Sequence, residues 1–405
     1  MKMASLFRCC LVLQALALVM VALPTQSISA AEYKEYKLGM TCPRSGDQKF
    51  IGDMQLAGVE IAIDEINSKG GIDGIPIKLI VEDNQAKPVN AVLALQKLIS
   101  VDKVPLAFTT YSTTQLAQAP IADKKKVVMI NTGATGAELI HSGKYIVHVQ
   151  PNAVDFLRIA INYMCENVGL KGKRWAIAYS NDAMGMSFNN YARSVLPKYG
   201  VKEIFSDNWQ APATDFRPIV AKIVDFKADA VFLAGWGKEN ALCLKQLKEA
   251  GYTGKVLSSY GGDVVSKEVG PSTVDGVYYA EQLIPDNDRI KVLKEKILNV
   301  RKLTMFHTQS INSYDAVYLV AEAIKYAKDH NRGSYFTGEK LLKAIVDKKQ
   351  FDTLSTPGTL DPAIMAVSRQ LGVKVMKDQG GKAVDETVKV YGAQDIKGLP
   401  EGKVK

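Results

Sequence analysis

The chain has 405 residues, a formal charge of +9 and five cysteines. This length exceeds what a single hydrophobic core usually serves, so it predicts two lobes. The basic residues are scattered in pairs and triplets such as 124–126, without interleaved aromatic residues, which argues against a nucleic-acid surface. Cys42, Cys165 and Cys243 are spaced for neither a disulfide framework nor a metal site, and we interpret them as small buried hydrophobic residues.

Residues 1–31 have the pattern of a secretory signal peptide. Lys2 and Arg8 give a basic start, an apolar run spans 9–23, and Ser29 and Ala31 are the small residues that precede a cleavage site. A retained membrane anchor is the alternative, but the apolar run is short for a membrane span. No later segment is apolar over a membrane-spanning length, so we expect a soluble periplasmic protein whose mature chain begins at Glu32.

The region 32–150 alternates strands and helices with the regularity of a doubly wound sheet. The apolar residues at positions 56, 59, 63 and 66 follow a helical period, and Gly70 and Gly71 provide the end of that helix. Dense Ile, Leu and Val content at 77–83 predicts a buried parallel strand. Further strands are expected at 36–42, 104–108 and 127–130, with helices at 89–100 and after the loop 109–114.

A second alternation with the same period begins at residue 171, and in it we expect a loop at 181–188 before a helix at 189–197. We expect the segment 148–156 to cross into this second lobe and 276–285 to return, while 373–376 and 388–391 pair as a hairpin in the tail. The prediction is an α/β protein of two doubly wound lobes joined by a multi-strand hinge. Lobe 1 spans 32–150, lobe 2 spans 151–275, lobe 1 resumes over 276–358, and the hinge crossing with the lobe 2 tail occupies 359–405. Such a hinge suits capture and release of a ligand.

The sequence lacks the signatures of catalysis and of metal binding. HExxH, GxSxG, a phosphate-binding loop and GxGxxG after a strand are all absent. The four histidines, at positions 141, 148, 307 and 330, lie in separate segments, and we interpret them as surface or locally hydrogen-bonded residues. We therefore expect a binding protein and not an enzyme, with no catalytic residues, cofactor or metal.

Two polar loops at neighbouring strand ends predict a site for an anion. The hydroxyl groups of 109–114 and 131–136, together with helix N-terminal amides, are suited to hold a carboxylate, although capping of helices is the alternative explanation. In the second lobe, Trp236 lies between two glycines, where a large ring has little reason to be unless it packs on something. Met184 and Tyr260 occupy equivalent strand exits, so these three side chains are candidates for the apolar side of a pocket.

Three segments, QLAGVEIAIDEINSKGGIDG at 55–74, 109–139 and SYDAVYLVAEAI at 313–324, resemble the periplasmic solute-binding proteins of ABC transporters of the branched-chain amino acid, or leucine-binding, type. The resemblance implies a class I periplasmic binding protein fold, a small-molecule ligand and an ABC permease in the inner membrane as partner. It implies that a ligand carboxylate is held by Tyr111, Ser112, Gly133 and Thr135, and that the family's aromatic positions fall on Met184 and Trp236. We expect a monomer with no nucleic-acid partner.

One position departs from this resemblance. Where the family's amino acid binders hold the ligand ammonium with a glutamate, this sequence has Tyr260, whose phenol supplies no countercharge at neutral pH. Asp263 is a possible substitute; without it, the ligand has no ammonium group. A hydrophobic amino acid and an aromatic or other organic acid therefore both stay open. An exported sensing module of the same fold that signals to a receptor is the alternative function, and a secreted hydrolase with an unrecognised nucleophile is a third.

Overall fold

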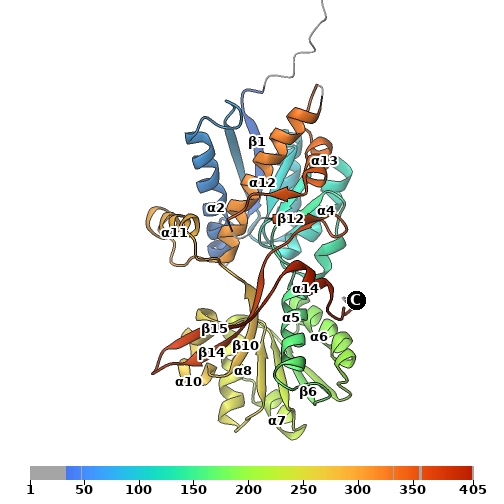
Figure 1. Ribbon diagram of the computed structural model, residues 1–405, viewed down its shortest axis with the longest axis vertical. Coiled ribbons are helices and arrows are strands. Elements are labelled where there is room, and N and C mark those ends of the chain that lie inside the picture. Colours follow the sequence, from blue (N-terminus) through green and yellow to red (C-terminus); the bar gives the residue numbers. More distant parts are fainter. Residues whose placement is uncertain (1–32, 47, 332, 355–357, 404–405) are drawn as a thin grey trace, which may run out of the picture.

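The computed structural model describes residues 33–403 apart from 47, 332 and 355–357. The chain forms two lobes, each built on its own sheet, and thin connecting segments join them at the waist of the molecule (Figure 1). This confirms the predicted α/β class with two lobes. The predicted signal peptide, 1–31, lies outside the described residues.

Lobe 1 contains an eight-stranded sheet with the strand order β11-β12-β13-β5-β4-β3-β1-β2. The first five strands along the chain are parallel, and the last three close one edge. The strands are β1 (Tyr36–Cys42), β2 (Ile77–Asp83), β3 (Leu106–Thr109), β4 (Val128–Asn131), β5 (Ile146–His148), β11 (Gln350–Phe351), β12 (Gly358–Asp361) and β13 (Ala366–Val367). The helices are α2 (Lys49–Ser68), α3 (Pro88–Ser100), α4 (Ser112–Lys125), α11 (Asp288–Glu295), α12 (Thr308–His330) and α13 (Gly338–Lys348), with short helical turns at Ala137–His141 and Lys296–Val300.

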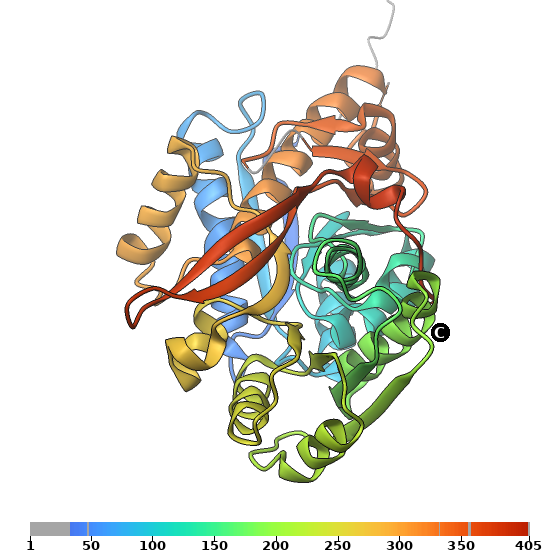
Figure 2. The ribbon, with the colours of Figure 1, turned by 60° about the horizontal axis from the view of Figure 1, so that its bottom comes forward.

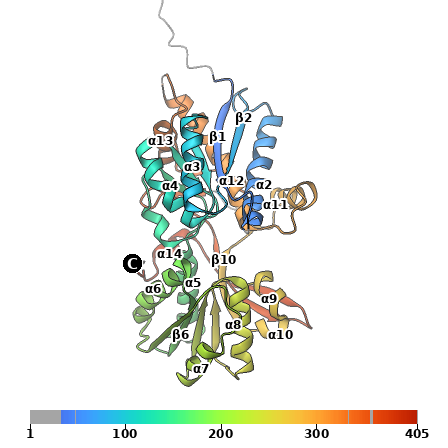
Figure 3. The same cartoon turned by 180° about the vertical axis from the view of Figure 1, so that it is seen from behind.

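The helices of lobe 1 cover both faces of its sheet, as seen from behind in Figure 3. The helices α2, α12 and α13 pack on one face and α3 and α4 on the other, so the strands are buried from both sides. Gly58 of α2 lets the backbone of α12 approach, because a Cβ at this position would lie 2.2 Å from the Ser310 carbonyl oxygen. The first helix of the lobe is thereby fixed against the helix that also carries the hinge contacts.

Lobe 2 contains a seven-stranded sheet with the order β15-β14-β10-β9-β8-β6-β7. Alternate residues of β6 show the strand period, since Trp175 and Ile177 join the core under α5 and α6, while Ala176 and Ala178 face the core under α7 and α8. The strands are β6 (Trp175–Ser180), β7 (Ile204–Trp209), β8 (Ala230–Ala234), β9 (Lys255–Ser258), β10 (Val277–Gln282), β14 (Leu371–Asp378) and β15 (Ala383–Tyr391). The helices are α5 (Ala153–Glu166), α6 (Ala183–Val195), α7 (Arg217–Asp225), α8 (Gly237–Glu249), α9 (Asp263–Val269), α10 (Pro271–Val274) and α14 (Ala393–Lys397), with a short helical turn at Leu196–Tyr199.

Several boundaries differ from those predicted. The return to lobe 1 begins after β10 and not at residue 276, because β10 pairs with β9 in the lobe 2 sheet. The segment 358–367 forms β12 and β13 of the lobe 1 sheet, so the last crossing is shorter than the predicted 359–405 region. The helix α5 was not predicted, and α6 begins at Ala183 and not at residue 189. The predicted tail hairpin is confirmed by the antiparallel pairing of β14 with β15, the long ribbon that crosses the molecule in Figure 2.

Three segments connect the lobes, at 149–152, 283–287 and 368–370. Asn312 of α12 joins the first two, because its amide donates to Gln150 Oε1 at 2.7 Å and to Gln282 Oε1 at 2.8 Å, and its oxygen accepts from Gln282 Nε2 at 3.0 Å. All three amides are buried. A fully paired buried amide network of this kind fixes the geometry of the hinge.

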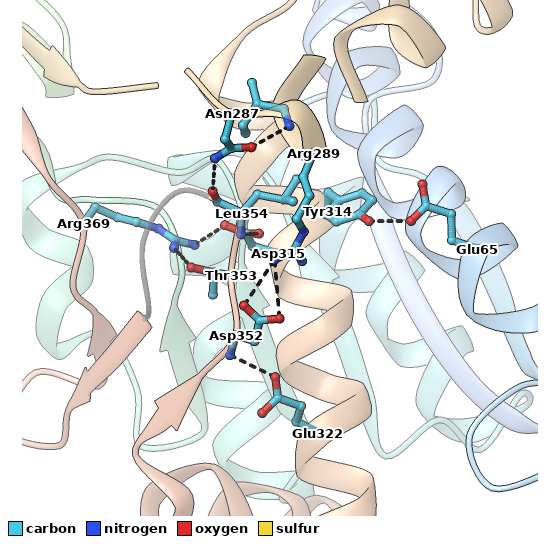
Figure 4. A network of polar contacts seen from close by, with 11 residues as sticks. Glu65, Asn287, Arg289, Tyr314, Asp315, Glu322, Asp352, Thr353, Leu354 and Arg369 are labelled. Atoms are coloured by element: carbon cyan, nitrogen blue, oxygen red, sulfur yellow. Dashed lines mark hydrogen bonds and ion pairs between the residues drawn. The ribbon is translucent and has the colours of Figure 1, made fainter. Parts of the chain in front are cut away.

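The third connecting segment is held by a buried ion pair, shown in Figure 4. Arg369 Nη2 lies 3.2 Å from Asp315 Oδ2, and both side chains are 1% exposed. Arg369 also donates to the Val149 carbonyl and to Thr353 Oγ1, while Asp315 Oδ1 accepts from the Leu354 amide at 2.6 Å. Asn312 and Asp315 of α12 therefore contact the first and third connecting segments, and Asn312 also contacts Gln282 at the end of β10.

Candidate ligand-binding cleft

A cavity lies between the two lobes beside the hinge. It measures about 980 Å³ including the part open to solvent, and its wall combines residues of lobe 1, lobe 2 and the connecting segments. Much of the apolar lining comes from lobe 2, namely Phe156, Leu157, Ala160, Phe188, Phe232 and Leu257. The polar lining includes Thr135, Gln150, Glu281, Gln282, His307 and Gln309. A cavity lined by apolar side chains and a few polar groups suits a small organic molecule.

The predicted residues divide into three groups by position. Thr135, Met184 and Tyr260 line this cavity. Tyr111 lies in a neighbouring depression of lobe 1 that is also lined by Ser45, Gly46, Gln48 and residues 85–87. Ser112, Gly133 and Trp236 are adjacent to these surfaces without lining the cavity. The structure therefore brings three of the seven predicted residues to the wall of one cavity, and contact of any of the seven with a ligand stays a prediction.

The lobe 1 side is a loop held by hydrogen bonds. Asn131 Oδ1 accepts from the amides of Gly133 at 3.1 Å and Ala134 at 2.7 Å, and Ser112 Oγ accepts from the Gly136 amide at 3.2 Å. Gly133 has no room for a side chain, because a Cβ there would lie 1.8 Å from Gln55 Nε2. Its amide donates to Asn131, and its contact with a ligand carboxylate stays a prediction.

The lobe 2 side carries a carboxylate that is hydrogen-bonded to one of two stacked aromatic rings. Asp182 caps helix α6, since its Oδ1 accepts from the Gly185 amide at 2.9 Å, and its Oδ2 accepts from Trp236 Nε1 at 2.8 Å. The Trp236 ring stacks on Tyr260 with centroids 6.1 Å apart and an interplanar angle of 29°. The ring of Trp236 therefore packs on the Tyr260 phenol, which lines the cavity, and its N–H donates to the Asp182 carboxylate.

Tyr111 brings lobe 1 to this cluster. Burial raises the pKa of the Tyr111 phenol above its ordinary value, and the charge of Asp182 raises it further. Burial likewise raises the pKa of Tyr260, with smaller contributions from Tyr111 and Asp182. Both phenols are therefore protonated at neutral pH and can donate hydrogen bonds across the cleft. The side chain of Asp263, the predicted substitute for a glutamate, lies outside what the structure describes.

The sequence profile of the family described as periplasmic binding protein matches residues 35–397. The chain belongs to the periplasmic binding protein family. It is 26% identical over 329 residues to an amino acid binding protein of Pseudomonas aeruginosa, covering 78% of this chain and 85% of that protein. It is 25% identical over 342 residues to Leu/Ile/Val-binding protein homolog 3 of Brucella melitensis, covering 81% and 88%.

Solved structures have the same fold. A leucine-binding protein of Thermotoga maritima superposes with a TM-score of 0.74 at 22% identity, covering 89% of this chain and 99% of that chain. A solute-binding protein of Rhodopseudomonas palustris in complex with 3,4-dihydroxybenzoic acid gives 0.72 at 22% identity, covering 89% and 98%. Family membership confirms that this is a binding protein and not an enzyme.

Three features of this periplasmic binding protein bear on the sequence predictions. None of the helices within 33–403 that the structure describes is long and apolar enough to cross a membrane. Within the same residues, no three His, Cys, Asp or Glu side chains are grouped so that they could hold a metal ion. Cys42, Cys165 and Cys243 are free and buried, as interpreted from their spacing.

Sequence reasoning missed three polar residues of this binding protein's cleft. Asp182 was placed in a loop, although an Asp before a helix is a common N-cap and was a usable signal. His307 is locally hydrogen-bonded, as interpreted, because its Nδ1 accepts from the Gln309 amide at 3.2 Å, but its place in the cavity lining was not foreseen. Burial lowers the pKa of His307, so it is neutral at pH 7. No sequence pattern marked Glu281 as a cleft residue, because its position in the cavity depends on how the two lobes are placed relative to each other.

Proposed function

We propose that this protein is the extracytoplasmic solute-binding component of an ABC importer. It captures one small organic molecule between its lobes, either a hydrophobic or branched-chain amino acid such as leucine, or an aromatic or other organic acid. The observation that carries this proposal is the cavity beside the hinge, which is lined by apolar side chains of lobe 2 and by polar side chains of both lobes.

The cleft residues have distinct roles in this proposal. Tyr111, Ser112 and Thr135 hold the polar head of the ligand from lobe 1, and Gly133 keeps their loop close to Gln55. Met184, Trp236 and Tyr260 enclose the rest of the ligand from lobe 2. A solute that contacts both lobes binds the closed form more tightly than the open one, and it shifts the protein toward closure by that difference in affinity.

The names of similar proteins support these ligand classes. The relatives include proteins named for binding amino acids and Leu/Ile/Val. The structural neighbours include complexes with isoleucine, 3,4-dihydroxybenzoic acid and 4-hydroxybenzoate. Because the chain is about equally similar to both groups, the ligand needs a direct measurement.

The protein acts in the periplasm as a monomer. Its signal peptide, 1–31, directs export, and a permease in the inner membrane binds the closed form. The recognised surface would consist of both lobes at once, because only closure brings them into a fixed relative position.

A thermal-shift panel tests the proposal. The protein is unfolded and refolded to remove co-purified solute, then heated with hydrophobic amino acids and with aromatic and aliphatic acids. A ligand at 100 times its Kd raises the free energy of unfolding by about 2.7 kcal/mol, which gives a clear increase in Tm. We expect at least one class to do so and to reduce the radius of gyration in X-ray scattering. No shift with any class would refute the proposed ligands.

A further inference from the structure

The hinge side of the cavity carries a buried amide that is held by a neighbouring helix. Gln150 lies in the first connecting segment, lines the cavity and is 5% exposed. Its Oε1 accepts from Asn312 Nδ2 at 2.7 Å. Asn312 is fixed in turn, because Gln282 both accepts from its Nδ2 and donates to its Oδ1. The Gln150 side chain therefore has one preferred orientation, set by α12.

The other branch of this amide is a donor without a partner. Among the residues that the structure describes, no atom accepts a hydrogen bond from Gln150 Nε2, whose sister atom Oε1 is occupied by Asn312. Because Oε1 faces α12, Nε2 is directed away from that helix, and the cavity is what Gln150 lines on its other side. A buried donor is costly to leave unpaired, so this one indicates an acceptor that binds in the cavity.

His307 contributes a second donor to the same cavity. It is the N-cap residue of α12, and its Nδ1 accepts from the Gln309 amide. A ring nitrogen that accepts carries no hydrogen, so the neutral imidazole has its N–H at Nε2. Within the described part of the chain, His307 Nε2 has no acceptor, and the residue lines the cavity. His307 therefore presents an N–H group for which the protein itself supplies no partner.

The two donors lie at one end of α12. Thr308 lines the cavity too, and Asn312 follows it by four residues, which places both on the same face of the helix one turn apart. Gln150 is bonded to Asn312, so it lies within about one helical turn of His307 and Thr308. The N-terminus of this 23-residue helix adds a partial positive charge. This part of the cavity therefore favours an oxygen over an amino group.

The one carboxylate that lines the cavity sets a limit on the charge of that oxygen. Glu281 lies in the lining, and its Oε1 is 2.5 Å from Lys374 Nζ of β14. The lysine compensates Glu281, but a further full negative charge in the same cavity would still be repelled by it. A hydroxyl or carbonyl oxygen meets no such repulsion. The neutral donors of Gln150 and His307 suit it equally well.

We infer that Gln150 Nε2 and His307 Nε2, at the N-terminus of α12, form a subsite for a neutral oxygen of the ligand, in a hydroxyl or carbonyl group distinct from its carboxylate. This inference rests on the proposed function and narrows its ligand class to acids that carry a second oxygen-bearing group. The carboxylate lies at the loops of lobe 1, as proposed above. A ligand held in this way contacts the hinge itself, because Gln150 belongs to a connecting segment.

Ligand pairs that differ in one hydroxyl group test the chemistry of the subsite. Benzoate is compared with 3- and 4-hydroxybenzoate, and L-phenylalanine with L-tyrosine, by calorimetry on refolded protein. In at least one pair the hydroxylated member should bind at least about tenfold more tightly. If the parent compound binds as tightly in every pair, or if only acids such as leucine without a second oxygen bind, the inference is wrong and the proposed function stands. If no amino acid or organic acid binds at all, both fail.

Substitution of Gln150 tests its assignment. Gln150→Met keeps about the length of the side chain and removes the Nε2 donor. It also removes an acceptor of Asn312, and that structural effect should weaken both members of a ligand pair alike. The ratio of the two affinities is therefore the readout, and we expect it to fall from about tenfold to less than about threefold. A weaker affinity for both members with an unchanged ratio would overturn the assignment.

His307→Asn tests the second donor without removing the helix cap. The asparagine oxygen can accept from the Gln309 amide as Nδ1 does, but the N–H of Nε2 is lost. The same affinity ratio should fall. If Gln150→Met has a Tm too low for binding measurements, this variant decides, and an unchanged ratio then overturns the inference.

Two control variants make the same chemical changes outside the cavity. Gln370→Met alters an exposed glutamine of the third connecting segment, and His330→Asn alters an exposed histidine at the far end of α12. Neither residue lines the cavity, so both affinities and their ratio should stay unchanged. A fall of the ratio in either control would mean that the effect at Gln150 or His307 is not local, and it would remove the subsite.

Discussion

The two faces of the cleft are built on different physical principles. On lobe 1, the loops after β3 and β4 have hydrogen bonds among themselves, through Asn131, Ser112 and the amides of Gly133 and Ala134. On lobe 2, the ring of Trp236 stacks on that of Tyr260, which lines the cavity, and Trp236 is 38% exposed. Lobe 1 therefore presents a preformed polar surface, whereas lobe 2 presents exposed ring area that a bound ligand would bury.

This difference suggests a division of labour. A preformed polar loop holds a ligand head without a large ordering cost, because its groups are already fixed. An exposed ring such as Trp236 discriminates among ligands, because the ligands differ in how well they cover the ring. This division depends on three features of the structure. The buried hinge contacts must hold the two lobes together, the lobe 1 loop must keep its hydrogen bonds, and the Trp236 ring must contribute more to ligand binding than to folding.

The largest effect is expected at the hinge. Asp315→Asn removes one charge of the buried pair and leaves Arg369 without its countercharge, which should lower the free energy of unfolding by about 3–5 kcal/mol. Denaturant unfolding followed by circular dichroism measures it. The control, Asp352→Asn, breaks an exposed pair with Arg289 in the same region and should cost less than about 1 kcal/mol. Equal losses would mean that the hinge pair does not hold the lobes together.

The second largest effect is expected from acid, which should lower the free energy of unfolding through His148 of lobe 1. Burial lowers the pKa of His148 from 6.5 to about 4, and its Nδ1 accepts from Asn131 Nδ2 at 2.9 Å. Between these values the unfolded chain binds a proton that the folded chain does not, so stability falls as pH decreases. The expected loss from His148 is about 2 kcal/mol at pH 5 relative to pH 7.5.

The variant His148→Gln provides the control for this pH effect. Its amide keeps an acceptor for Asn131 but cannot be protonated in this range. Urea unfolding of both proteins at several pH values should show a steeper loss of stability below pH 6.5 for the native chain. Parallel curves would assign the acid sensitivity to other groups and remove His148 from the description of lobe 1.

The sequence predicted the layers of the molecule better than the cleft between them. Periodicity and glycine positions located the lobe 1 strands, because each depends on neighbours within a short stretch. The start of α6 was missed for a physical reason: Gly185 was interpreted as a loop residue, yet it is required because a Cβ there would lie 2.1 Å from the Ser180 carbonyl oxygen. A contact between a strand end and the following helix has no periodic signal.

The same limit applies to the site. Tyr260 and Met184 were found from their positions at strand exits, and both line the cavity. Glu281 and Gln309 come from the hinge strand and from the start of α12, and only the packing of the two lobes brings them to one cavity. Asn152 marked the start of α5 by capping the Val154 amide, but the preceding proline favoured a simple crossing. The sequence indicated residues at strand exits and helix caps, but it did not indicate how the two lobes bring distant residues together.

Substitution of the exposed ring tests the lobe 2 side of the comparison. Trp236→Ala should weaken ligand binding about tenfold or more, since it removes both ring area and the hydrogen bond to Asp182. Its cost to folding should stay near 1 kcal/mol or below, because the side chain is not in the core. Calorimetry and thermal unfolding separate the two effects. Val224→Ala, at another 38% exposed position of lobe 2, should change neither, and an unchanged affinity of the Trp236 variant would remove it from the site.

The smallest effect is expected from Ser112, whose hydroxyl accepts from the Gly136 amide at 3.2 Å. Ser112→Ala deletes one hydrogen bond of a partly buried loop and should cost about 0.5–1.5 kcal/mol of stability. Thr113→Ala, the exposed neighbour in the same helical turn, is the control for helix propensity. If the lobe 1 loop is preformed by several bonds, as Asn131 suggests, loss of one should weaken ligand binding by less than Trp236→Ala does. A larger loss of affinity at Ser112 would reverse the division of labour, because the hydroxyl would then bind the ligand more strongly than it supports the loop.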